Sequence, residues 1–132
     1  MRNKILYSAL LILLILTGCD AAISLQGKVA SISSGKFLYQ DGNLISEYKA
    51  DIDSVWRACE KSVTELKATD VKKERKISTG IIKAIVQDEK VTISVEYVER
   101  NLTSVSVFVG KVGNNMASRL IHDKIIGNLV KN

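Results

Sequence analysis

Two stretches decide the fold, Val-Thr-Ile-Ser-Val-Glu-Tyr at 91–97 and Ser-Val-Ser-Val-Phe-Val at 104–109. Both place an apolar residue at every second position, mostly separated by Thr, Ser or Glu. Because successive side chains of a strand point to opposite faces, this alternation predicts an antiparallel sheet with one buried and one solvated face.

Two further segments, 71–77 and 80–87, also have strand-like sequences and lie directly before these stretches. Asp88-Glu89 and Arg100-Asn101 interrupt the apolar pattern and are interpreted as turns between consecutive strands. The four segments follow one another without a helical segment between them. They therefore predict a four-stranded antiparallel meander.

A short hairpin and a helix are expected before the meander. Residues 37–39 and 44–49 flank Asp41-Gly42, a pair that supplies the positive φ angles of a tight type I′ turn. The helix that follows has Asp51 as its expected N-cap, with Asp53 near the positive end of the helix dipole. Its expected apolar face consists of Ile52, Val55, Trp56, Cys59, Val63 and Leu66.

A second helix is predicted from about Asn115 to the C-terminus. The glycines of Gly110-x-x-Gly113 are interpreted as a strand-to-helix turn, followed by an Asn as the helix cap. The expected core-facing residues are Met116, Leu120, Ile121, Ile125 and Leu129. The predicted fold class is therefore α+β: strand, helix, four strands and helix, with both helices packed on one face of the sheet.

The chain has 132 residues, of which 46% are hydrophobic, which predicts one globular domain, assigned to residues 36–132. Its beginning differs from the rest. Arg2 and Lys4 precede an apolar run at 5–16 that is too short for a permanent membrane span. Residues 1–18 are therefore expected to be a secretory signal peptide.

This signal ends in Leu16-Thr17-Gly18-Cys19, a pattern that resembles the bacterial lipobox. Enzymes that recognise a lipobox attach a diacylglycerol to the cysteine sulfur and cleave before it, so Cys19 is expected to carry acyl chains that hold the protein to a membrane. The Ser-rich residues 19–35 are interpreted as a flexible tether. The formal net charge of +5 does not indicate a nucleic-acid partner, because an exported protein meets little nucleic acid.

Other motifs follow in order: Gly42 in an extended segment, Asp51-x-Asp-x-Val-Trp56, Val91-Thr-Ile-Ser-Val, and Thr103-Ser-Val-Ser-Val-Phe-Val-Gly110-x-x-Gly113 before Ser118-Arg119-x-Ile121. Over about residues 36–130 the chain thus resembles a family of small bacterial lipoproteins of unknown function, and it is similar to a virulence-associated Francisella lipoprotein. The resemblance implies a helix-grip fold similar to that of the Bet v 1 allergen, which often keeps an apolar cavity between sheet and helix. It implies no enzymatic activity and no catalytic residues.

The candidate site residues form two groups. The first is expected in the space between sheet and helices. This space is either a cavity that binds an apolar ligand or a closed core without a cavity. The first group consists of Tyr48, Trp56, Val95, Tyr97, Ile121 and Ile125. The second group is the charged cluster Lys72, Lys73, Arg75 and Lys76, which is either an edge strand protected by charge or a contact for anionic lipid headgroups.

Catalytic and metal chemistry is not expected, and no cofactor is implied. His122 is the only histidine, so the chain cannot supply a pair of histidines for a zinc site. Next to Asp123 on a helix, His122 is expected to be solvated at the surface. Cys59 is expected to be a small core residue. Ser33-Ser34-Gly35-Lys36 matches Ser-x-x-Lys, but the partner motifs of penicillin-binding enzymes are missing.

The expected function is that of a non-catalytic, monomeric envelope lipoprotein whose domain binds an apolar ligand or an envelope protein. The alternative is an interaction or structural module with a closed core that uses an edge strand or its exposed sheet face, where Thr92, Ser94, Ser104 and Ser106 lie. The resemblance favours the outer membrane as its location. The inner membrane is the alternative location, because Asp20 directly follows the cysteine that is expected to be lipidated.

Overall fold

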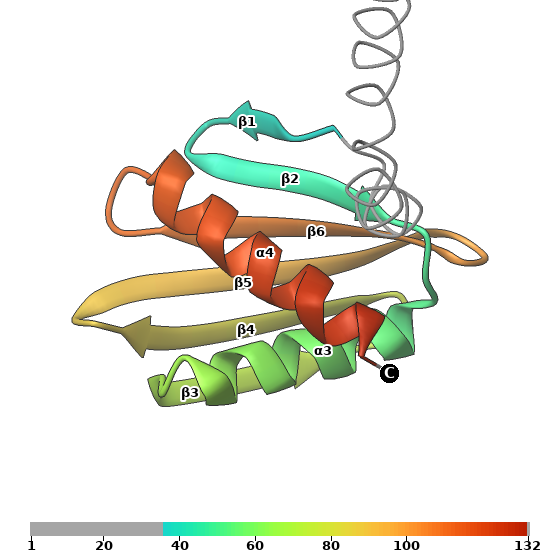
Figure 1. The fold of residues 1–132 in the computed structure, drawn as a ribbon, viewed down its shortest axis with the longest axis horizontal. Coiled ribbons are helices and arrows are strands. Elements are labelled where there is room, and N and C mark those ends of the chain that lie inside the picture. The colour runs from blue at the N-terminus through green and yellow to red at the C-terminus, as the bar shows by residue number, and fades with distance from the viewer. Residues whose placement is uncertain (1–35, 132) are drawn as a thin grey trace, which may run out of the picture.

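The computed structural model describes residues 36–131, which form a six-stranded antiparallel sheet and two helices (Figure 1). The predicted signal peptide, the lipidated Cys19 and the tether lie outside the described residues. The strands are β1 (Leu38–Gln40), β2 (Asn43–Tyr48), β3 (Thr69–Arg75), β4 (Thr79–Val86), β5 (Glu89–Glu99) and β6 (Leu102–Val109). Helix α3 (Ile52–Glu65) lies between β2 and β3, and α4 (Asn115–Val130) follows β6.

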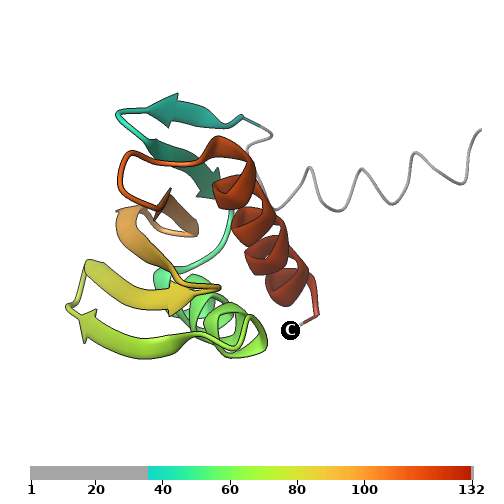
Figure 2. The same cartoon turned by 90° about the vertical axis from the view of Figure 1, so that its left-hand side faces the viewer.

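The strand order in the sheet is β1-β2-β6-β5-β4-β3. The last four strands are the predicted meander, and β2 joins it by pairing antiparallel with β6. The charged strand β3 is at an edge, as expected, although it ends at Arg75, so Ile77 lies in the turn before β4. The α+β class is confirmed, with both helices on one side of the sheet (Figure 2).

The predicted hairpin is confirmed between β1 and β2. Gln40 pairs with Asn43, and the two residues between them, Asp41 and Gly42, have φ angles of 52° and 81°. Two consecutive positive φ angles are the requirement of a type I′ turn. Gly113 lies against this turn, because a Cβ added at Gly113 would be 2.4 Å from the Cα atom of Gly42. The two glycines thus let the β1–β2 turn and the β6–α4 loop approach at backbone contact.

Helix α3 begins where the sequence predicts. The Asp51 side chain accepts a hydrogen bond from the Ser54 backbone N–H at 3.0 Å and another from the Ser54 hydroxyl, which holds the pKa of Asp51 below its ordinary value. The expected apolar face is confirmed, and the buried set also includes Ala58 and Ser62. Because a side-chain oxygen accepts one of the unpaired N–H groups at the helix start, Asp51 acts as the N-cap.

Helix α4 begins at the predicted residue, with Asn114 as its N-cap, but its predicted core face is partly wrong. Met116 and Leu120 are 77% and 66% exposed. The buried face instead consists of Ser118, Ile121, His122, Ile125, Ile126 and Asn128. Two of its polar side chains are paired: Asn128 donates to the Ser62 hydroxyl, and His122 binds groups on β2. Such pairing offsets the cost of burying polar groups, so this face packs against both α3 and the sheet.

Candidate functional site

The space between the sheet and the helices contains four of the six predicted cavity residues. Tyr48, Val95, Ile121 and Ile125 are buried in one continuous apolar cluster with side chains of α3, β4 and β6. Trp56 is half-buried at the margin of this cluster. Tyr97 is 47% exposed, near the β5 end, and the structure does not bring it together with the other five.

His122 lies inside this core, so the expectation that it is solvated at the surface is wrong. Its Nδ1 atom is 2.5 Å from the Tyr48 hydroxyl and its Nε2 atom is 2.7 Å from the Leu44 carbonyl oxygen. A carbonyl can only accept a hydrogen bond, so Nε2 carries the proton and donates, while Nδ1 accepts from the tyrosine. Both ring nitrogens are therefore occupied in holding α4 to β2.

Burial favours the uncharged forms of these groups. Burial lowers the pKa of His122 below its ordinary value, which keeps the ring neutral, and burial raises the pKa of the Tyr48 hydroxyl. Cys59 is fully buried, as predicted, and burial raises the pKa of its thiol as well. The thiolate is the reactive form of cysteine, so this residue is an inert part of the core. Residues 36–131 contain no group of three or more His, Cys, Asp and Glu side chains placed to hold a metal ion.

Half-buried Trp56 packs against the edge of the sheet through Gly80 and Arg75. A Cβ added at Gly80 would be 2.5 Å from the Trp56 ring, so only a glycine leaves room for it there. The Arg75 guanidinium lies 5.9 Å from the centre of the ring, within the range of a cation–π contact. Arg75 also forms an ion pair with Asp53 at 2.7 Å. Trp56 is therefore covered by β3 and β4, not directed into a cavity.

The four basic residues predicted to contact anionic lipid headgroups do not lie together in the structure. Lys73 and Arg75 are on the helix side of β3, where they pair with Glu60 and Asp53 of α3. Lys76 lies 3.8 Å from Glu74. Lys72 is on the outer face of the sheet, the face opposite α3 and α4, and is the one member of the four with no ion pair within residues 36–131; Glu74, the partner of Lys76, lies on the same face. The four residues therefore do not form one surface.

The outer face has a mild polarity in its middle, as expected. Thr92 and Ser94 of β5 lie beside Phe108 and Ser106 of β6, and all four are partly exposed. Ser104 faces the same way. Because both helices cover the other face, this row of small hydroxyl side chains remains accessible in the part of the chain that the structure describes.

Two lysines that sequence reasoning missed accompany Lys72 on the outer face. Lys83 of β4 is paired directly opposite Lys72 of β3, and Lys90 of β5 lies diagonally from Lys83 because it pairs with Ile85. Their positions along the chain give no sign of this proximity. The alternation of β4 and β5 indicated which way each side chain points, but the register that makes them neighbours comes only from the fold.

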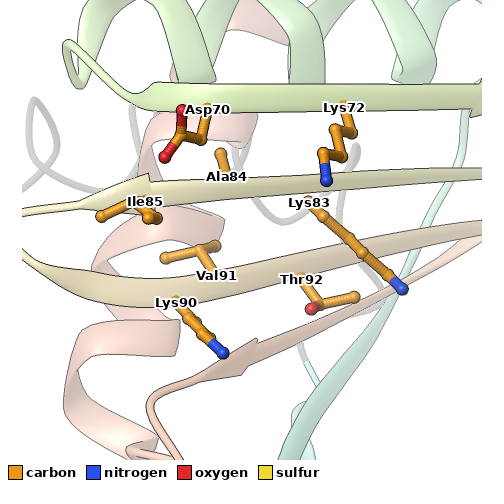
Figure 3. Close-up of a pocket in the computed structure, with 8 residues that line it drawn as sticks. All are labelled: Asp70, Lys72, Lys83, Ala84, Ile85, Lys90, Val91 and Thr92. Carbon is orange, nitrogen blue, oxygen red and sulfur yellow. The ribbon is translucent and has the colours of Figure 1, made fainter.

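These lysines line a hollow of about 500 Å³ over β3, β4 and β5 (Figure 3). In the close-up, Lys72 extends from β3 toward β4, Lys83 crosses β5, and Lys90 extends from β5. The other residues around the hollow are Asp70, Ala84, Ile85, Val91 and Thr92. With three ammonium groups and one carboxylate, the hollow has a net positive charge.

The family model described as "Protein of unknown function (DUF3568)" matches residues 4–128 of the chain. No curated protein matches the sequence. Within residues 36–131, no helix is both long and apolar enough to cross a lipid bilayer.

Proposed function

The chain belongs to the DUF3568 family of proteins of unknown function, and we propose that it is a non-catalytic, lipid-anchored binding module of the bacterial cell envelope. Its working surface is the outer face of the sheet. The observation that carries this proposal is the asymmetry of the fold: both helices pack on one face, and the other carries accessible hydroxyl and ammonium groups.

The filled interior favours a surface function over an internal ligand site. The core between sheet and helices is packed with buried side chains, and two hydrogen bonds of His122, one accepted from the Tyr48 hydroxyl and one donated to the Leu44 carbonyl, cross the space where an apolar ligand would lie. A ligand there would have to break these bonds and leave buried polar groups unpaired. An apolar ligand would be seen in native mass spectrometry as an extra mass that disappears in organic solvent, and we expect the bare mass.

The burial of the reactive groups supports a non-catalytic role. His122 and Cys59, the only histidine and the only cysteine among residues 36–131, are both fully buried. Neither can reach a substrate on the surface. The remaining acidic and basic groups in this part of the chain are mostly exposed and free of the burial that tunes a general acid or base.

The proposed anchor rests on the lipobox-like sequence that ends in Cys19. Metabolic labelling with an alkyne fatty acid tests it directly. Cys19→Ala should lose the label and leave the membrane fraction, while Cys59→Ala, a change at the other cysteine, should keep both. A label that survives in Cys19→Ala would contradict lipidation at this position. The helix-grip likeness to Bet v 1, the choice of membrane and the similarity to a virulence-associated Francisella lipoprotein stay predictions.

Site-specific photo-crosslinking in cells tests the working surface. A photoreactive amino acid at Ser94, in the middle of the outer face, should give a discrete cross-linked product. The matched control is Leu120, which is exposed on the solvent side of α4, away from the sheet. Products at Leu120 with none at Ser94 would contradict the proposal, because they would move the working surface to the helix side.

A further inference from the structure

The hollow lined by Lys72, Lys83 and Lys90 brings three basic side chains together on the outer face of the sheet. Lys72 and Lys83 are directly opposed on neighbouring strands, where Cβ atoms lie about 4.5–5.5 Å apart. Lys90 is a diagonal neighbour of Lys83, at about 7–8 Å. In the structure the three side chains do not converge on one point (Figure 3), but rotation about the bonds of their flexible stems can turn the ammonium groups toward one small anion between them.

Among the described residues, Lys72, Lys83 and Lys90 have no acidic partner, a property they share with Arg57 and Lys61 of α3 but not with the other basic residues of β3 and of the helices. Lys73, Arg75, Lys76, Arg119 and Lys124 each form an ion pair. No ion pair within residues 36–131 involves Lys72, Lys83 or Lys90. Their charges are therefore not neutralised by an ion pair, although the carboxylate of Glu74, which pairs with Lys76, lies on the same face two positions from Lys72.

The pairing of Lys72 with Lys83 has a cost for the sheet, because like charges directly opposite each other destabilise neighbouring strands. An anion between the two would replace this repulsion with two attractions. Asp70 lies at the rim of the same hollow and partly offsets its positive charge. The hollow thus favours a compact group with a full negative charge, such as a phosphate, over an extended neutral molecule.

We propose that this hollow binds the phosphate of an anionic phospholipid headgroup. The inference deepens the proposed function and rests on it, because the expected acyl chains on Cys19 would keep the domain beside a bilayer. A flexible tether over residues 19–35 would have an end-to-end distance of roughly 20–25 Å, which leaves the sheet within reach of the headgroups. Two contacts with the membrane, one covalent and one electrostatic, would then fix the orientation of the domain.

The test uses the full-length protein in neutral maltoside micelles, observed by amide NMR. Phosphatidylglycerol added to the micelles should shift the amide signals of Lys72, Lys83, Lys90 and Thr92. Diacylglycerol, which has the same acyl chains and no phosphate, should leave them unchanged. Raising the salt to 1 M, where the screening length falls to about 3 Å, should abolish most of the shift.

Four variants connect the shift to the hollow. Lys83→Gln and Lys90→Gln should each weaken binding about fivefold, as expected for the loss of one lysine at an anionic surface. Asp70→Asn should strengthen binding severalfold, because it removes the negative charge at the hollow. The variant should fold normally, since Asn tolerates the positive φ of 49° at this position. Lys61→Gln, the same chemical change at an exposed position on α3, should have no effect.

Three outcomes would overturn the inference. The first is no shift with phosphatidylglycerol, and the second is equal binding by Lys83→Gln and Lys61→Gln. The third is inorganic phosphate binding as tightly as the lipid, which would assign the hollow to a soluble anion. If binding fails while the cross-link at Ser94 persists, the outer face is still the working surface and its partner is a protein. If both fail, the proposed function fails as well.

Discussion

Removing the hydrogen bond between Tyr48 and His122 tests most directly how α4 is held to the sheet. Tyr48→Phe removes only the hydroxyl that donates to His122 Nδ1. The ring cannot recover by moving its proton, because Nε2 must keep it to donate to the Leu44 carbonyl. The variant therefore leaves one buried acceptor, His122 Nδ1, without a partner, and it also removes the hydrogen bond between the Tyr48 hydroxyl and Ser46.

A buried polar atom without a partner costs about 1–3 kcal/mol, because it loses its hydrogen bond and gains no water. We take the middle of this range, about 2 kcal/mol, since the ring stays fully buried. For a domain of this size each kcal/mol corresponds to about 4–8 °C in Tm, so the variant should melt roughly 8–16 °C lower.

Thermal unfolding followed by circular dichroism measures the change. The control is Tyr39→Phe, the same substitution at a tyrosine of β1 that is 44% exposed, and it should alter the free energy of unfolding by less than about 0.5 kcal/mol. Equal Tm values for Tyr48→Phe and Tyr39→Phe would refute the reasoning, because the hydrogen bond to His122 would then contribute nothing.

Three further predictions concern stability. Burial holds the pKa of His122 below its ordinary value of 6.5, so the unfolded chain takes up a proton at a higher pH than the folded protein does. As the pH is lowered from about 6.5, the free energy of unfolding should therefore decrease, by at most about 1.4 kcal/mol per pH unit. Urea titrations of His122→Gln should lack this decrease between about pH 6.5 and 5. Gly113→Ala should lower the free energy of unfolding by about 3 kcal/mol, because its methyl group would meet the backbone of Gly42. Gly127→Ala should raise the free energy of unfolding by about 0.5–1 kcal/mol, because its methyl group has no atom within 4 Å. Similar values for the two variants would contradict the glycine contact. Asn114→Ala should cost about 1 kcal/mol in the same titrations through loss of the N-cap, and an unchanged midpoint would exclude that role.

The sheet, the hairpin and α3 could be predicted because local sequence determines them. Asp41-Gly42 suits only a few turn conformations, and alternating residues in 91–97 fix which face is buried. The buried face of α4 could not be predicted in the same way. Apolar residues occur on both sides of this helix, and the choice depends on Tyr48 and Leu44, whose contacts to His122 span more than 70 positions of sequence.

The lysine hollow shows the same limit at the candidate site. Lys72 was part of a visible charge cluster, but its neighbours in that cluster point to the helix side or pair with each other. Lys83 is a single charge inside an apolar strand, and Lys90 directly follows the predicted Asp88-Glu89 turn, so both resemble ordinary solvated residues. Only the strand register, a tertiary property, brings the three together.

Lysine footprinting in the native envelope tests most directly whether the outer face is the working surface. An amine-reactive ester would be applied to intact membranes and to the protein purified in maltoside, and labelling of each lysine would be compared by mass spectrometry. Lys83 and Lys90 should be labelled severalfold less in the membranes, while Lys61 of α3 and Lys111 of the β6–α4 loop, both exposed, should be labelled equally in the two samples. Protection of Lys61 and Lys111 with free labelling of Lys83 and Lys90 would contradict the account.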